Sequence, residues 1–127
     1  MGKDVLFVSE AEMFDRIKAS FDGGADPTLG YQRAGVLIID DVGKAQLTEW
    51  SVSVYFLIVD YRWSHHLQTL FTSQMNISDW TNTAGDANKR TADALESRLK
   101  GSCQSYSLGG SDRRQEKTEI LALLRTR

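Results

Sequence analysis

The stretch GVLIIDDVGK at residues 35–44 constrains the fold of this 127-residue chain more than any other. Four apolar residues, 36–39, run directly into two adjacent carboxylates, Asp40 and Asp41. An apolar run that does not alternate with polar residues predicts a strand buried on both faces, as in a parallel sheet covered by helices. Two acids at the end of such a strand predict that a positively charged group binds there.

The rest of the chain alternates between strand-like and helix-like patterns. Residues 48–63 are ambiguous, because their β-branched residues favour a strand whereas a cap at Thr48 and an apolar stripe favour a helix. We choose the helix, since two parallel strands need a crossover between them. The predicted strands are residues 4–8, 36–39, 67–73 and 103–108, and the predicted helices are residues 9–21, 48–63, 91–99 and 114–127. This order predicts one α/β domain over residues 1–127, with a mainly parallel sheet flanked by helices.

Local signals support the two outer helices of this prediction. Ser9 and Glu12 have the spacing of a capping box, and Met13, Ile17 and Phe21 follow at helical spacing. The final helix is predicted to turn Ile120, Leu121 and Leu124 inward. Residues 23–30, 82–90 and 109–114 are predicted as loops or turns.

Composition limits the class of protein. The net charge of −2 gives the whole molecule no attraction to nucleic acid. Residues 89–127 alone carry 9 Lys and Arg against 5 Asp and Glu, which suits either a polyanion or a solvated helix face. The single cysteine, Cys103, excludes an internal disulfide and a cysteine-rich metal site. Because there is no signal peptide and no run of 18 apolar residues, we expect a cytoplasmic protein that does not bind a membrane.

Polar residues follow two of the predicted strands. Asp40 and Asp41 end one strand, and Thr72, Ser73 and Gln74 end the next. Both ends should meet at the carboxyl edge of a parallel sheet, where ligands bind. Mg²⁺ favours one or two carboxylates together with phosphate oxygens, so the pair fits a Walker B strand, in which the first acid holds Mg²⁺ and the second polarises water. The alternative is that the acids cap the next helix or face solvent.

The ordered set of motifs resembles one family. The motifs are GKDVLFVSEAEMFDRIKASFD, VLIIDDVGK, DYRW, TLFTSQMNISDW, LESRLKG and GGSDRR. In this order and spacing they resemble the bacterial replicative-helicase loaders and transposase-helper ATPases, the DnaC-like and IstB-like AAA+ proteins. The resemblance implies a P-loop NTPase fold, ATP and Mg²⁺ as cofactors, assembly with like subunits, and a replicative helicase or a transposase as partner, with DNA contacted through the parent protein.

The resemblance also implies a role for individual residues. Asp40 matches the acid that coordinates Mg²⁺, and Asp41 matches the acid that positions water. Gln74 stands where the family usually has the sensor I asparagine. Arg98 matches the arginine finger, which acts on a neighbouring subunit's nucleotide because its planar charge stabilises the transferring phosphoryl group. Arg114, or alternatively Arg113, matches the sensor II arginine beside the phosphates. Arg62 matches a recurrent YR pair to which the resemblance gives no role.

The sequence lacks the phosphate-binding motif GxxxxGK[ST]. Gly43-Lys44 is followed by Ala45, and Ile38 stands where the first glycine would be. Without the loop, the chain is expected to be a partial AAA+ domain that cannot hydrolyse ATP alone. By the resemblance, the absent first strand would lie between the third and fourth strands of this chain, and its loss would leave unpaired edges.

Three functions stay open besides the helicase loader. The first is a transposase helper, which acts on duplex DNA together with a transposase. The second is a non-catalytic remnant that serves only as an interaction subunit, which the missing P-loop and Gln74 favour. The weakest is a Mg²⁺-dependent receiver domain, for which no phospho-acceptor aspartate and partner lysine are found on separate strands.

Overall fold

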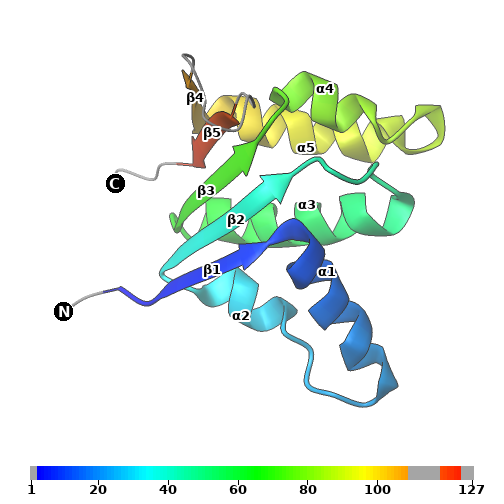
Figure 1. Cartoon of the computed structure of the whole chain (residues 1–127), viewed down its shortest axis with the longest axis vertical. Coiled ribbons are helices and arrows are strands. Elements are labelled where there is room, and N and C mark those ends of the chain that lie inside the picture. The colour runs from blue at the N-terminus through cyan, green and yellow to red at the C-terminus, as the bar shows by residue number, and fades with distance from the viewer. Residues whose placement is uncertain (1–2, 109–117, 124–127) are drawn as a thin grey trace.

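A computed structural model describes residues 3–108 and 118–123 of the chain. The elements in chain order are β1 (Val5–Ser9), α1 (Glu10–Ala19), η1 (Ser20–Asp22), α2 (Thr28–Arg33), β2 (Val36–Val42), α3 (Glu49–Ser64), β3 (Gln68–Ser73), α4 (Ile77–Asn82), η2 (Asp86–Asn88), α5 (Lys89–Ser102), β4 (Cys103–Leu108) and β5 (Thr118–Leu123). The predicted α/β fold is confirmed, because β1, β2 and β3 pair in parallel and are joined through helices (Figure 1).

The predicted caps explain where α1 and α3 begin. The Ser9 side chain accepts a hydrogen bond from the Glu12 backbone N–H, and Met13 and Ile17 are buried beneath α1. Thr48 and Ser51 form a capping box at the start of α3, so the ambiguous segment is a helix, as predicted. Phe21 does not continue the buried stripe: it lies in η1 and is 67% exposed.

Two short helices were not predicted from the sequence. Helix α2 begins within the predicted loop 23–30, and α4 lies between β3 and the predicted loop 82–90. Each has six residues, too few to show a helical period. An Asn76 cap, whose side chain accepts a hydrogen bond from the Asp79 backbone at 2.8 Å, is the local signal that could have revealed α4.

The predicted C-terminal helix is wrong in the part that the structure describes. Residues Thr118–Leu123 form β5, which pairs antiparallel with both β3 and β4. The strand order is therefore β1-β2-β3-β5-β4, and β5 occupies the place between the third and fourth strands where an unpaired edge was expected. The pattern of a short apolar run is compatible with a helix or a strand. Here the segment is a strand because its backbone pairs with β3 on one side and β4 on the other. Leu124 and the predicted turn at residues 109–114 lie outside the described residues.

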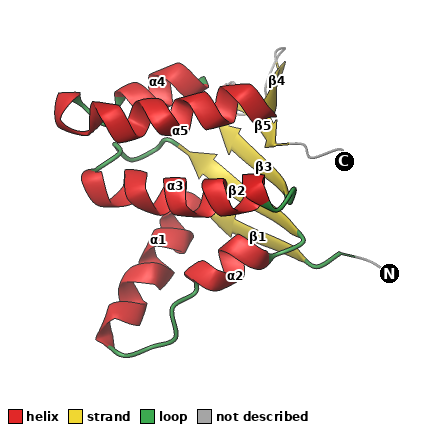
Figure 2. Ribbon diagram, turned by 180° about the vertical axis from the view of Figure 1, so that it is seen from behind, coloured by secondary structure: helices red, strands yellow, loops and turns green. Residues whose placement is uncertain are grey.

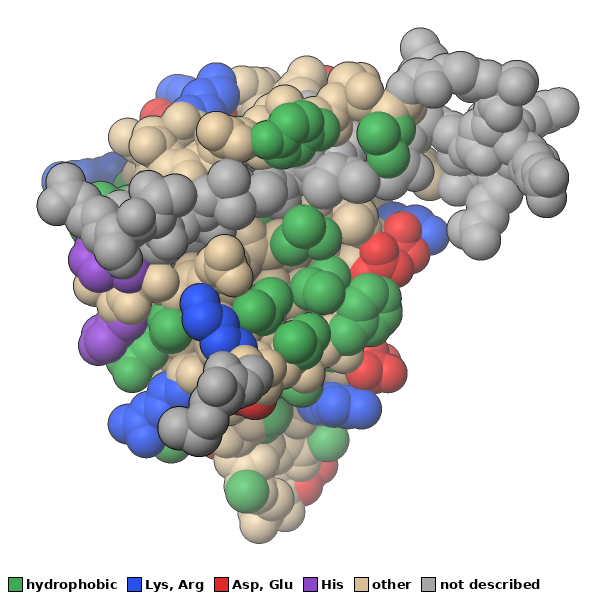
Figure 3. All heavy atoms as spheres, turned by 90° about the vertical axis from the view of Figure 1, so that its left-hand side faces the viewer, with side chains coloured by type: hydrophobic (Ala, Val, Ile, Leu, Met, Phe, Trp, Pro, Cys, Tyr) green, Lys and Arg blue, Asp and Glu red, His purple; other side chains and the backbone are tan. Residues whose placement is uncertain are grey.

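The described helices lie on one side of the sheet (Figure 2). In β2, Leu37 and Ile39 are buried toward them, whereas Val36 and Ile38 are only half-buried. The prediction that this strand is buried on both faces is therefore wrong in the described structure. Apolar side chains gather on the opposite face (Figure 3), where Val5 and Phe7 are each 61% exposed. No helix of the described part is long and apolar enough to cross a membrane.

Candidate functional site

The two acids of β2 lie in a break in the strand pairing. Ile39 pairs with Phe71 and Val42 pairs with Ser73, so Asp40 and Asp41 together oppose the single residue between them on β3, Thr72. This is a β-bulge, a feature that re-aims side chains and is common near active sites. Asp41 takes a left-handed backbone conformation, with φ 58°.

The bulge decides where both carboxylates point. In a regular strand alternate residues face opposite sides, so Asp41 would lie on the buried side with Leu37 and Ile39. The extra residue shifts this alternation, and Val42 takes the buried position at 2% exposure. Asp41 is left exposed and Asp40 half-buried. Two successive acids are thereby available at the same edge of the sheet.

The predicted meeting of two strand ends is seen directly in the hydrogen bonds of Thr72. Its hydroxyl donates to Oδ1 of Asp40 and accepts the backbone N–H of Asp41 at 3.0 Å. The next residue, Ser73, donates its hydroxyl to the Val42 carbonyl at 2.6 Å. The ends of β2 and β3 are therefore joined by side chains where the bulge interrupts the backbone ladder.

Gln74 shares a small cavity with one of the two acids. Asp41 and Gln74 line the same small cavity of about 70 Å³, together with Gly43 and Met75. Gly43 has φ +95°, and a Cβ there would meet the Met75 sulfur at 3.0 Å. Glycine is therefore required at this turn by both its backbone conformation and the available space.

The charges at the carboxyl edge of the sheet suit a cation that is also coordinated by oxygens from outside the protein. Lys44 Nζ lies 3.6 Å from Asp41 Oδ2, but both side chains are exposed, so this pair contributes little. No group of three or more His, Cys, Asp or Glu side chains that could hold a metal occurs among residues 3–108. Two carboxylates alone fit Mg²⁺ only when phosphate and water oxygens complete its shell. The donors present thus fit a magnesium-bound phosphate ligand.

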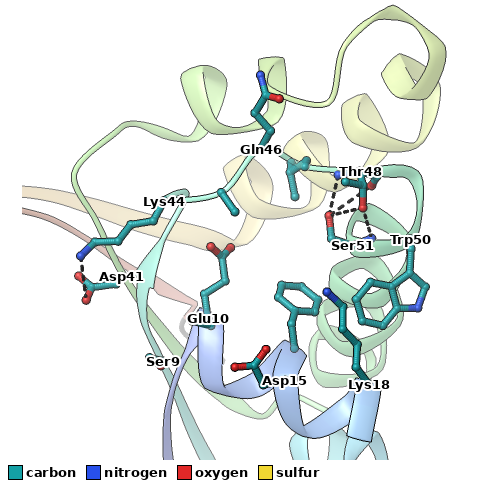
Figure 4. Close-up of a pocket in the computed structure, with 14 residues that line it drawn as sticks. Ser9, Glu10, Asp15, Lys18, Asp41, Lys44, Gln46, Thr48, Trp50 and Ser51 are labelled. Atoms are coloured by element: carbon teal, nitrogen blue, oxygen red, sulfur yellow. Dashed lines mark hydrogen bonds and ion pairs between the residues drawn. The ribbon is translucent and has the colours of Figure 1, made fainter. Parts of the chain in front are cut away.

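A larger cavity of about 480 Å³ opens beside the acid pair, between α1 and the segment after β2 (Figure 4). Phe14 and Trp50 form part of its wall, with ring centroids 5.3 Å apart, and Lys18 lies over the Trp50 ring. Trp50 itself is half-exposed. Lys44 reaches away from the cavity to Asp41 in this view.

Glu10 is a buried carboxylate that the sequence did not single out. It is 5% exposed, and its Oε1 accepts hydrogen bonds from the Tyr55 hydroxyl at 2.6 Å and the Gly43 N–H at 3.4 Å. Burial raises the pKa of Glu10 above its usual value of 4.5, and these hydrogen bonds oppose the shift. Glu10 therefore ties α1 to α3 and to the turn that follows the acids.

Replacing Glu10 by glutamine should flatten the pH dependence of stability. The raised pKa means that the folded state binds the proton more tightly than the unfolded chain, so this stabilisation is complete below about pH 4.5 and is lost as the pH rises through the folded-state pKa. Urea unfolding midpoints at a series of pH values measure the slope. The exposed Glu12→Gln variant is the control and should keep the wild-type slope. Equal slopes in wild type and Glu10→Gln would contradict the assignment.

The predicted arginines do not join the acids within the described structure. Arg98 Nη2 forms an ion pair with Asp60 Oδ1 at 2.8 Å, and its guanidinium lies 4.3 Å from the centre of the Trp63 ring. Because α3 runs back from the end of β2 to the start of β3, Asp60 near its C-terminus lies toward the opposite edge of the sheet from Asp41. Arg113 and Arg114 lie outside the described residues.

Arg62, which had no predicted role, is fully buried and has a structural role. Its guanidinium donates to the carbonyls of Tyr31, Gln32, Ala34 and Gln68 and to the Thr69 hydroxyl, at 2.6–3.1 Å. Three of these carbonyls lie at the C-terminal end of α2, where helical carbonyls have no partner within the helix. Burial lowers the pKa of Arg62 to about 10, so the side chain stays charged at neutral pH.

Comparison with known proteins agrees with this geometry. A family model described as IstB-like ATP binding protein matches residues 1–120, nearly the whole chain. No curated protein matches it. The family match fits a parallel α/β sheet whose second strand ends in two available acids. The chain belongs to the IstB-like ATP-binding protein family, as its resemblance to DnaC-like and IstB-like AAA+ proteins indicated.

Proposed function

We propose that the chain supplies the magnesium-binding side of an ATP site in an AAA+ ATPase that loads a replicative helicase onto single-stranded DNA. Family membership supports the coarser part, an ATPase-type function with ATP as the nucleotide. The observation that carries the proposal is the bulge, which leaves Asp40 and Asp41 together at the carboxyl edge. Mg²⁺, when bound with ATP, neutralises phosphate charge and orients the phosphates.

In this proposal each residue at the edge has a separate task. Asp40 holds the magnesium ion, and Asp41 accepts a hydrogen bond from the attacking water. Gln74, beside Asp41 at the small cavity, orients that water through its amide. The motif of a phosphate-binding loop is absent from this sequence, so in this proposal the acid pair reaches the phosphates through Mg²⁺.

The proposed assembly follows from the place of Arg98. Within one copy its ion pair with Asp60 holds it far from Asp40 and Asp41, so it can act on a nucleotide only at a boundary between like subunits. Arg114, or Arg113, is proposed to contact the phosphates. We propose a cytoplasmic homo-oligomer without membrane contact.

The magnesium dependence of ATP binding tests this proposal. Calorimetric titration with ATP should show binding that needs Mg²⁺, and Asp40→Ala should weaken it about tenfold or more, because the ion loses a protein ligand. Asp79→Asn, an exposed acid in α4, is the matched control and should bind as wild type. Binding that is equally strong without Mg²⁺, or in Asp40→Ala, would contradict the proposal.

Two alternatives make different demands on the same chain. A transposase helper fits the same family match equally well, and it predicts nucleotide-dependent binding to duplex rather than single-stranded DNA. A non-catalytic interaction subunit is favoured by the missing P-loop motif and by Gln74. It predicts no response of ATP binding to Asp40→Ala, so the same titration separates it from both ATPases.

A further inference from the structure

We infer that Thr72 is the positioning residue of the acid pair, with one hydroxyl that holds both Asp40 and Asp41 in place for a divalent cation. This inference rests on the proposed function, because it names the residue that prepares the same site. Thr72 touches neither substrate nor metal in this role. It acts through the two carboxylate residues that oppose it across the bulge.

The first part of the role concerns the backbone. A bulge leaves one residue outside the regular ladder, and its N–H then needs another acceptor. The N–H of Asp41 finds it in the Thr72 hydroxyl oxygen at 3.0 Å. This contact supports the left-handed conformation of Asp41, φ 58°, which a residue with a side chain adopts only at a cost.

The second part concerns the carboxylate of Asp40. The same hydroxyl donates its proton to Oδ1, which fixes the orientation of the carboxylate and leaves Oδ2 outside this hydrogen bond. Hydrogen bonds of this kind fix the orientation of a metal-binding carboxylate, and their loss typically costs ten- to a hundredfold in metal affinity. One threonine therefore sets the direction of one acid and the backbone of the next.

The position of Thr72 makes the inference separable from stability. Thr72 is half-buried and alternates along β3 with Phe71 and Ser73, which face the helices, so truncation of Thr72 leaves no cavity under the helices. Thr81 offers a matched control: its buried hydroxyl donates to the carboxylate of Glu96 at 3.0 Å, away from the acid pair. Removing the Thr81 hydroxyl thus breaks the same kind of bond with no contact to the bulge.

The experiment is a titration of the ¹⁵N-labelled chain with Mn²⁺ alone, which broadens the amide signals of nearby residues. Wild type should show selective broadening at Asp40, Asp41 and Gly43. Thr72→Val and Thr72→Ala should need about tenfold more Mn²⁺ for the same broadening. Thr72→Ser, which keeps the hydroxyl, should restore the wild-type response, and Thr81→Val should not change it.

The outcomes separate this inference from the function on which it rests. Equal broadening in wild type, Thr72→Val and Thr72→Ala would overturn the role of Thr72 and leave the proposed function intact. A loss of Mn²⁺ broadening in Thr81→Val as large as that in Thr72→Val would show that both substitutions act through general stability. It would also overturn the positioning role of Thr72. Absence of selective broadening in wild type, with the same spectrum in Asp40→Ala, would overturn the role of Thr72 in preparing a site for the free ion, whereas the proposed function is tested separately by the titration with ATP and Mg²⁺.

Discussion

Replacing Arg62 by alanine should lower the free energy of unfolding by at least about 3 kcal/mol, a large share of the 5–15 kcal/mol of a typical domain. The substitution leaves buried carbonyl groups without a donor and opens a cavity where a fully buried side chain stood. Urea unfolding followed by circular dichroism measures the loss.

The size of this effect follows from what the guanidinium connects. It joins the C-terminal end of α2, the last turn of α3 and the start of β3 in one group of hydrogen bonds. Arg62→Lys should give an intermediate loss, since an ammonium group cannot reproduce the fork of donors. Arg33→Ala, at the exposed end of α2, is the control and should change stability by less than about 0.5 kcal/mol. A loss below about 1 kcal/mol in Arg62→Ala would contradict the structural role.

Replacing Trp80 by alanine should cost about 3–5 kcal/mol, the usual range for removal of a large buried aromatic side chain. Trp80 is 1% exposed and meets the Tyr55 ring edge to face, with centroids 4.8 Å apart. It joins α4 to Tyr55 of α3, and α4 has only six residues of its own. The same urea titration gives the value.

Trp63 provides the matched control for Trp80. Its ring is half-buried and carries the Arg98 guanidinium on one side, so Trp63→Ala should cost less than about 1.5 kcal/mol. If the two substitutions were equally destabilising, the assignment of Trp80 as the anchor of α4 would be wrong.

The sequence was sufficient to predict the elements whose signals are local. The apolar run at residues 36–39 gave β2, and the Thr48 cap marked the start of α3. The two strand ends that should meet do meet, because parallel strands share their carboxyl edge and Thr72 contacts Asp40 there. These features depend on neighbours in the chain or on a general rule of parallel sheets.

The features that the sequence did not reveal depend on distant residues. Helix α2 is capped by Arg62, thirty residues further along the chain, so its own six residues carried little signal. The strand β5 is fixed by pairing with both β3 and β4, which a pattern of apolar residues cannot report. Glu10 also depends on distant residues. From the sequence it is an acid in the first turn of α1 that favours the helix dipole, and only its contacts with Tyr55 and Gly43 show its structural role.

The bulge is the most informative of these features for function. Asp40 and Asp41 could be named from the sequence, but a regular strand would have turned one of them toward the helices. Only the pairing of Val42 with Ser73 shows that both acids take one position opposite Thr72. The candidate site thus consists of residues that could be named in advance and a backbone arrangement that could not.

The most direct test of this account is the location of bound nucleotide in the ¹⁵N spectrum of the chain, recorded with ATP, with Mg²⁺ and with both. The account predicts that the largest shifts occur only with both present and centre on Asp40, Asp41 and the end of β3 at Thr72 and Gln74. Shifts that centre on Trp50 and Glu10 in the larger cavity, or that occur with ATP alone, would contradict it, because the nucleotide would then bind without the acid pair.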